Sequence, residues 1–533
     1  MRSLTTDGAM NTRASRSLCI AAAILLLGVA GCTDTLVEPK SAVTGANIFN
    51  DPSSYRAFLA KIYAGLAVSG QQGPAGRGDI QGIDEGFSHY VRLIWEAQEL
   101  PTDEAIIGWN DPGLPELNTQ LWAASNPFVV SMYYRIYFQV AMANEFLRET
   151  SDAKLEERGV SQDLRAEIQQ YRAEARYLRA FSYWHGIDLF GDIPLVDETF
   201  PIGATPPPQA TRTEVFDFVV SELNAIRAEL PGIGAGDYGR ADQGALLMLL
   251  AKLYQNASVY GGGDRQAEAR AALEEVIGSG AYQLDPDYGD MFLADNHTSP
   301  ELIFTVPQDG IRTQSFGGTT FLVHAAVGGN MDVNEYGIDF AWWGLRMKPE
   351  AYLRYEEGDG RASYFFTEGQ SVQIGNIGDF YQGIAAPKYR NVTSSGQPGS
   401  HSTHADVDYP VFRMGDAYLM YAEAVLRGGG GSEELALSYV NALRERAFGD
   451  VSANITQAEL TLEFLLDERS RELLWEGHRR TDLIRFGQFT ENGVWAWKGG
   501  VEAGRTTEAF RDLYPLPASE LLANPNLEQN PGY

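Results

Sequence analysis

The side chains that could do chemistry are concentrated near the C-terminal end, where acidic and arginine residues alternate. The segment 465–487, LLDERSRELLWEGHRRTDLIRFG, carries Glu468, Glu472 and Glu476 among five arginines. Two carboxylates that flank one bond would allow a glycoside to be hydrolysed. Opposite charges three or four residues apart on a helix, however, pair with each other. We therefore interpret the segment as an ion-paired structural helix and keep a secreted glycoside hydrolase as an alternative.

Signatures of other catalytic sites do not occur in the sequence. It has no G-x-S-x-G nucleophile elbow, no G-x-x-x-x-G-K-[ST] phosphate loop and no H-E-x-x-H zinc pair. The 71 acidic and 41 basic residues give a formal net charge of −30, which repels nucleic acid. With 44% hydrophobic residues the chain still has enough apolar material for a packed core. These features favour a globular binding protein that does not bind nucleic acid.

Two aspartates in the stretch HADVDYP, residues 404–410, have a spacing that suits a cation site. Asp406 and Asp408 alternate with Val407, so in an extended chain both carboxylates face the same side. Carboxylate oxygens are ligands that Ca²⁺ prefers. The alternative is a pair of solvated aspartates that cap the next helix.

The elements that must position these side chains are mostly helical. In the segment that starts at Ser161, apolar residues recur at helical spacing, and Gly191 and Pro194 end it. Trp122 and Trp184 fall on helical faces, so we expect both to be packed. The same analysis predicts further helices over 129–150, 213–230, 240–258, 265–279, 413–427, 433–447 and 458–486.

Several of these helices form pairs joined by short glycine-rich turns, as in 252–284 and 418–449. Small residues on the paired faces allow close helix approach. The plan resembles tetratricopeptide helix pairs, although the 34-residue consensus is degraded; a bundle of unrelated helical hairpins is the alternative. The small residues concerned are Ala251, Ala269, Ala272, Ala422 and Ala424.

Residues 295–412 differ from the helical segments. They are rich in Gly, Trp, Tyr and Asn, and they contain the strand-like runs ELIFTV and FLVHAAV. Long loops held on a rigid helical base commonly carry binding surfaces. We therefore expect the ligand to bind in this region.

The N-terminal segment has the pattern of a secretory signal. Arg13 and Arg16 precede an apolar run of 13 residues, Leu18 to Ala30, which is too short to span a membrane. The following Val29-Ala30-Gly31-Cys32 is similar to the lipobox of bacterial lipoproteins, in which the chain is cut before the cysteine and its thiol is lipidated. We predict a signal peptide over 1–31, a lipidated N-terminus and tether over 32–50, and one domain over 51–533.

Motifs spread over the chain resemble the SusD/RagB family of outer-membrane nutrient-binding lipoproteins. The start, TDTLVEPK after the lipobox, is similar to the start of that family. Four further stretches resemble the family's later signatures in the same order: RAEARYLRAFSYWHGIDLFGDIPLV, DVDYPVFRMGDAYLMYAEA, DERSRELLWEGHRRTDLIRFG and LYPLPASELLANPNLEQNPGY.

The resemblance implies a mainly α, SusD-like single domain. About four tetratricopeptide-like helix pairs would form its scaffold, and a loop-rich region with short strands would bind the ligand. It also implies a lipoprotein on the bacterial surface, anchored to the outer membrane, that serves a TonB-dependent, SusC-like transporter. The implied function is binding of oligosaccharide without catalysis and without a required cofactor. A peptide-binding, RagB-like uptake component is the alternative within the family.

The resemblance also indicates which residues contact the ligand. An early family loop after a DE pair supplies one tryptophan, and LPTDEAIIGWNDPGLPELNTQLW places Trp109 and Asn110 there. Because this loop is polar and rich in Gly and Pro, we expect Trp109 to be exposed. Arg92 lies upstream and is expected beside Trp109. Later loops of the family supply aromatic residues, and the corresponding stretch NEYGIDFAWWGLR offers Tyr336, Trp342, Trp343 and Arg346.

Some relatives in the family bind calcium near the motif that contains Asp406 and Asp408, with an acidic residue from an earlier loop. Asp309 in VPQDG is the corresponding candidate for the third ligand. The resemblance thus implies a structural Ca²⁺ held by these three aspartates.

The lipid anchor gives a direct test. Replacing Cys32 by Ser should release the protein from the membrane fraction or leave it unprocessed, because the sequence has no second long apolar run. The measurement is fractionation of cells that lack the barrel partner. Tight membrane association of the Cys32→Ser protein would contradict the lipoprotein prediction.

Overall fold

The long amphipathic segments fold as helices close to the predicted bounds, because their apolar stripes face a shared core. Ser161 caps α8 as predicted, its hydroxyl accepting from the Leu164 amide. The main helices are α3 Ser53–Ala67, α4 Tyr90–Glu99, α6 Pro127–Glu149, α8 Gln162–Phe190, α9 Arg212–Ile226, α10 Gln243–Gln255, α11 Gln266–Gly278, α14 Met414–Ala424 and α15 Glu433–Phe448.

The computed structural model describes residues 48–49, 51–201, 203 and 205–533. The region 52–533 forms one compact unit. The predicted signal peptide, Cys32 and nearly all of the tether lie outside the described residues. Within the described ranges, no helix is long and apolar enough to cross a membrane.

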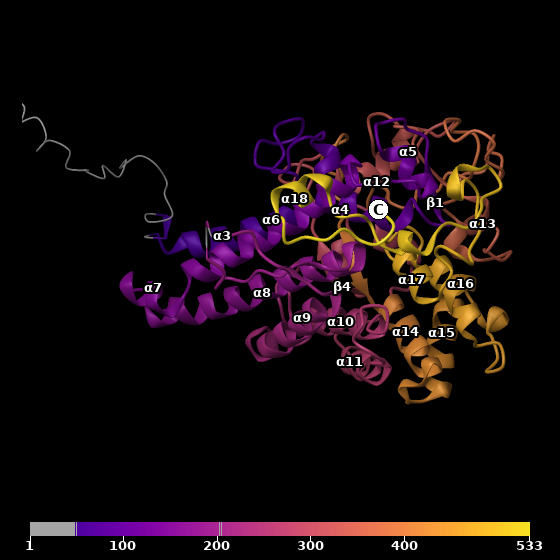
Figure 1. The fold of residues 1–533 in the computed structure, drawn as a ribbon. Coiled ribbons are helices and arrows are strands. Elements are labelled where there is room, and N and C mark those ends of the chain that lie inside the picture. Colours follow the sequence, from indigo (N-terminus) through magenta and orange to yellow (C-terminus); the bar gives the residue numbers. More distant parts are fainter. Residues whose placement is uncertain (1–47, 50, 202, 204) are drawn as a thin grey trace, which may run out of the picture. The chain divides into compact units, whose positions relative to one another are not determined.

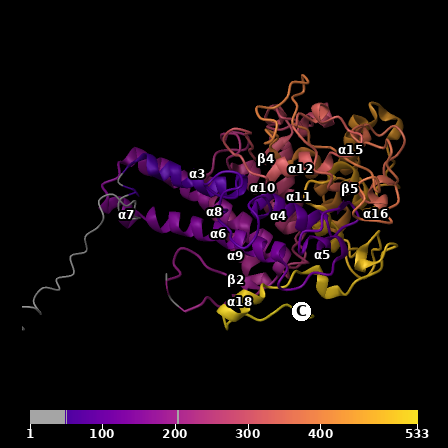
Figure 2. The same ribbon diagram turned by 90° about the horizontal axis from the view of Figure 1, so that it is seen from above.

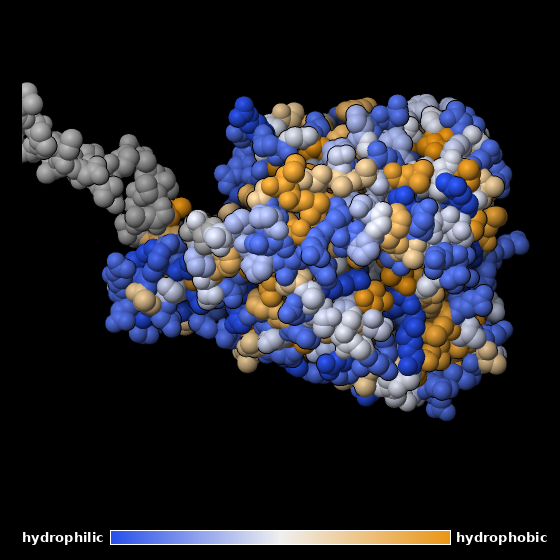
Figure 3. Space-filling view, in the orientation of Figure 1, coloured by the Kyte–Doolittle hydropathy of each residue, from blue (hydrophilic) through white to orange (hydrophobic). Residues whose placement is uncertain are grey.

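Helices that follow one another in sequence pack side by side, as Figures 1 and 2 show for α6 and α8. α8 also packs on α9, α10 on α11, and α14 on α15. The alanines predicted to permit close approach are all buried. Trp122 and Trp184 are buried too, as expected, although only Trp184 lies on a helix, and Trp122 lies between α5 and α6. The face drawn in Figure 3 is mostly hydrophilic, with separate hydrophobic patches.

The predicted helix over 458–486 is wrong, because it is two helices. α16 spans Leu462–Leu473 and α17 spans Arg479–Arg485. Thr456 and Glu459 do bond to each other, but α16 begins only after its cap Thr461. Between the helices, Trp475 and Gly477 adopt positive φ angles of 61° and 78°, which ends a right-handed helix.

The described part of the chain has three short antiparallel strand pairs. They are β1 Ala105–Ile107 with β5 Leu345–Met347, β2 Ile193–Pro194 with β3 Gln209–Ala210, and β4 Leu302–Val306 with β6 Tyr409–Arg413. Two of these pairs, β1–β5 and β4–β6, join segments far apart in the sequence. ELIFTV forms β4 as predicted. The run FLVHAAV is instead part of helix α12, Gly318–Ala326, since a short apolar run that is buried on all sides has no periodicity to separate strand from helix. The short helices are α5 Leu114–Thr119, α7 Asp152–Glu157, α13 Pro349–Tyr352 and α18 Ala518–Ala523.

The acidic and arginine segment is an ion-paired core, as predicted, and its pairs link different elements. Arg413 of β6 bonds Glu301 and Glu472 at 2.7 Å each and Glu476 at 2.7 Å, and all four side chains are buried. Burial alone would raise the pKa of Glu472, but Arg446, Arg413 and Arg361 outweigh it and hold that pKa below its ordinary value.

This network predicts a large effect of one substitution. Arg413→Met should lower the free energy of unfolding by about 3–5 kcal/mol, because breaking a buried ion pair leaves uncompensated charge in the core. Urea denaturation measures the change. The matched control is Arg265→Met, which removes an exposed pair with Glu268 at 2.9 Å and should change stability by about 1 kcal/mol or less. Equal losses in both variants would contradict the structural role of the buried network.

Candidate functional site

The β1–β5 ladder brings two predicted site loops together. Trp109 follows β1 directly, and Trp342 and Trp343 precede β5. The Trp109 Nε1 donates to the Trp342 carbonyl at 3.0 Å, and the two rings lie 6.1 Å apart. A side chain at Gly344 would come within 2.7 Å of the Trp109 ring, so glycine permits this close packing.

Helix α12 fixes the position of the tryptophan pair. The end of a helix leaves backbone carbonyls without partners. Here Trp342, Trp343 and Gly344 donate their amides to the carbonyls of His324, Val327 and Ala325, at 2.9, 3.0 and 2.9 Å. The segment misread as a strand therefore anchors the site.

Four rings from three loops form a continuous surface. Trp342 lies 6.1 Å from Trp109, 6.3 Å from Phe316 and 6.2 Å from Phe340. Phe340 is 49% exposed, and the other three rings are half-buried. The His324 ring stacks behind Trp342 at 4.7 Å. We call Trp109, Phe316, Phe340 and Trp342 the aromatic face.

Arg92 lies beside Trp109 as expected, with its guanidinium 5.5 Å from the ring. Arg92 is only 3% exposed, however, so it has little surface available for direct contact with a ligand. It pairs with Glu96 at 2.9 Å and donates to the Phe316 carbonyl at 3.3 Å. Burial raises the pKa of Glu96 to about 7, although Arg92 opposes that shift. Arg92 therefore supports the aromatic face from below.

The remaining predicted contacts divide between the surface and the interior. Asn110 is exposed, and among the described residues its amide has no hydrogen-bond partner. Tyr336 and Arg346 are buried, contrary to the expectation that they contact ligand. Arg346 instead donates to backbone carbonyls, and burial lowers its pKa to about 10. Sequence alone could not separate these cases, since the stretches around them show no periodicity that would distinguish buried from exposed positions.

Trp343 is exposed but belongs to a different cluster. Its φ of 56° turns the chain, and its ring lies 5.7 Å from Phe380 and 6.1 Å from Tyr381. Sequence reasoning missed Phe316, Phe340 and Tyr381. The only available signal was the abundance of aromatic residues in the loop-rich region.

The expected calcium site is not formed by the three aspartates. Asp406 and Asp408 do face the same segment, but they accept from the amides of Gly310 and Gln308, at 2.7 Å each. Asp309 turns away and bonds amides of its own turn. Within the part of the chain that is described, no group of three His, Cys, Asp or Glu side chains could hold a metal ion. Bound Ca²⁺ at Asp406 and Asp408 stays a prediction from the family resemblance.

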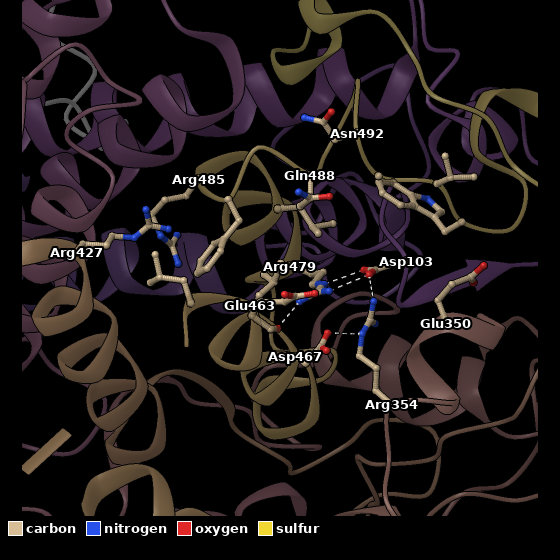
Figure 4. A pocket seen from close by; sticks show the side chains of 17 residues that line it. Asp103, Glu350, Arg354, Arg427, Glu463, Asp467, Arg479, Arg485, Gln488 and Asn492 are labelled. Atoms are coloured by element: carbon tan, nitrogen blue, oxygen red, sulfur yellow. Dashed lines mark hydrogen bonds and ion pairs between the residues drawn. The ribbon is translucent and has the colours of Figure 1, made fainter. Parts of the chain in front are cut away.

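A separate crevice of about 700 Å³ lies between α16, α17 and the 486–495 segment. Figure 4 shows that Arg354 and Arg479 converge on Asp103. Arg354 also pairs with Asp467 at 3.0 Å. These pairs hold the turn before β1 against α17, and we assign this charge cluster a structural role.

Comparison with known proteins identifies the family. A model of the SusD family matches residues 340–533. Starch-binding protein SusD of Bacteroides thetaiotaomicron is 33% identical to this chain, over 98% of the chain and 100% of that protein. The chain belongs to the SusD family. SusD-like protein P2 of Formosa agariphila is 26% identical over 96% of the chain and 98% of its own length.

Solved structures show the same SusD-like fold. Surface glycan-binding protein A from Bacteroides thetaiotaomicron, in complex with laminarihexaose, superposes with a TM-score of 0.70 at 21% identity, over 90% of this chain and 99% of that one. A SusD superfamily protein from Parabacteroides distasonis gives a TM-score of 0.70 at 21% identity, over 92% and 100%. The mainly helical fold class predicted from the sequence is thereby confirmed.

The Glu96 carboxyl below the aromatic face predicts a pH effect. Its pKa of about 7 in the folded protein exceeds the ordinary value of 4.5, so folding takes up a proton and stability falls as pH rises between these values. The Glu96→Gln variant has no carboxyl group to titrate at this position, so it does not lose stability in this way as pH rises. The melting temperature of the variant should therefore rise relative to wild type from pH 4.5 to pH 7. A difference that stays constant over this range would contradict the assignment.

Proposed function

We propose that the protein binds oligosaccharides at the aromatic face. The observation that carries this proposal is the arrangement of Trp109 and Trp342, held by a hydrogen bond between their loops beside the exposed ring of Phe340. Apolar faces of sugar rings stack on such side chains, and a small number of polar groups fix their hydroxyls. The free amide of Asn110 is placed next to Trp109 to do so.

The ligand class that we favour is an α-glucan of the starch type. Support comes from the starch-binding relative, which aligns with nearly the whole chain. The laminarihexaose complex of a fold neighbour makes β-glucan oligosaccharides the natural comparison. A binding assay with both series separates the two.

We further propose that the protein is a lipoprotein of the outer membrane, anchored at Cys32, that delivers glycan to a TonB-dependent, SusC-like transporter. The lipobox supports the anchor. Membership of the SusD family supports the setting. Co-purification of the barrel partner with the tagged protein tests the delivery role.

Peptide uptake and glycan hydrolysis are the alternatives. A binding face with fewer exposed aromatic rings than this one would favour a peptide ligand. Hydrolysis needs two carboxylates on one bond, whereas the aromatic face consists of rings. Affinity electrophoresis in starch, with product analysis on the same polysaccharide, distinguishes binding alone from binding with cleavage.

Trp109 should be a main stacking platform. Loss of a well-desolvated aromatic anchor costs about 2 kcal/mol or more, so Trp109→Ala should weaken glycan binding by more than about tenfold. The melting temperature should fall by only a few degrees, because the ring is half-buried. Trp122→Phe, at a buried indole outside the face, is the control and should bind normally. A folded Trp109→Ala protein with wild-type affinity would contradict the site.

A further inference from the structure

Next to the aromatic face, the protein presents a second exposed set of rings. Trp342 and Trp343 are consecutive but contact different partners. Trp342 meets the aromatic face, whereas Trp343 meets Phe380 and Tyr381. Trp343 is 45% exposed and Tyr381 is 37% exposed, while Phe380 is buried beneath them. Adjacent exposed rings of this kind offer flat apolar surfaces on which sugar rings can stack.

One buried arginine holds the loop that carries this second set. Arg346 donates to the carbonyls of Gln382 at 2.9 Å and Asp379 at 3.1 Å, and also to that of Ile377. It donates in addition to Gly344 at 2.8 Å, beside the tryptophan pair. The guanidinium is fully buried. Because its planar fork bonds both loops at once, their relative position is fixed.

Glycines allow the rings of Phe380 and Tyr381 to pack close to the neighbouring backbone. A side chain on Gly328 would meet Phe380 at 2.7 Å, and one on Gly329, where φ is 60°, would meet Tyr381 at 3.2 Å. A Cβ on Gly369 would be 3.4 Å from the Asn330 amide and 3.9 Å from the Tyr381 ring, so both side chains border Gly369. In the described ranges Asn330 has no hydrogen-bond partner for this amide and is exposed.

We propose that Trp343, Tyr381 and Asn330 form a second sugar-binding subsite, which binds the continuation of a glycan chain already held at the aromatic face. This proposal rests on the proposed function. Two exposed rings and a free amide repeat the chemistry of Trp109, Trp342 and Asn110. Trp342 and Trp343 are consecutive, so the backbone joins the two surfaces directly. Arg346 is a positioning residue for the subsite.

The subsite makes affinity depend on glycan length. A short oligosaccharide fits the aromatic face and gains nothing from Trp343. A longer chain reaches both surfaces, and the second contact forms at high effective concentration once the first is made. The second subsite therefore adds affinity for long chains alone.

The test compares maltotriose with maltoheptaose, and laminaritriose with laminariheptaose, by isothermal titration calorimetry. Trp343→Ala and Tyr381→Ala should each weaken heptasaccharide binding by about tenfold or more and change trisaccharide binding by less than about twofold. Two independent variants are used so that misfolding of one does not decide the result. Leu353→Ala, which trims an exposed apolar side chain outside both surfaces, should leave both affinities unchanged.

The outcomes are distinguishable. Unchanged heptasaccharide affinity in both variants, or equal losses for short and long chains, would overturn the second subsite while leaving the proposed function intact. Wild-type protein that binds none of the four sugars would overturn the proposed function, and the subsite with it. Arg346→Lys should lose length dependence while trisaccharide affinity is retained; loss of both would assign Arg346 to the fold as a whole.

Discussion

The pairing of buried charges is the constraint on which the rest of the structure depends. A charge that leaves water needs a partner, so each buried guanidinium determines where the elements that carry its carboxylates can lie. Arg413 does this for β6 and α16. Arg479 does it for α17 and the turn before β1, since it bonds Asp103 at 2.7 Å. The aromatic face begins at the other end of that strand, so core and ligand surface share one framework.

The β1–β5 ladder links this charged framework to the loops of the aromatic face. Its three residue pairs join segments more than two hundred positions apart in sequence, and neither strand would persist alone. Lys348, just after β5, donates to the carbonyls of Leu100 and Thr102, at 3.3 and 2.6 Å. Burial lowers the pKa of Lys348 to about 7. Both strands are thus tied to the same turn, which leaves the two tryptophan loops little freedom to separate.

Sequence patterns predicted those features of the structure that depend on residues near one another in the sequence. Helix positions followed from apolar periodicity and caps, whereas the polar loop predicted an exposed Trp109, and the structure shows that ring half-buried beside an exposed Asn110. The break at Trp475 was not predictable, because side chains of Trp95 and Tyr389 satisfy its freed carbonyl from far along the chain. The buried location of Arg346 was missed for the same reason, since a loop arginine is ordinarily solvated and only tertiary carbonyl partners make it interior. Phe316 and Tyr381 join their clusters through contacts with another loop of the chain.

The adjacent positions of Trp342 and Trp343 have a consequence for how this protein can diverge. Trp342 is bound to α12 and to the Trp109 loop, whereas the partners of Trp343 come from the separate segment 370–383. Substitutions in that segment can remodel the outer rings without disturbing the inner ones. If the proposed subsite binds the far end of a glycan, selection for other glycan lengths would act on that segment, while selection to retain the aromatic face would act on residues held by the core. Orthologues from different habitats are expected to vary most in that segment.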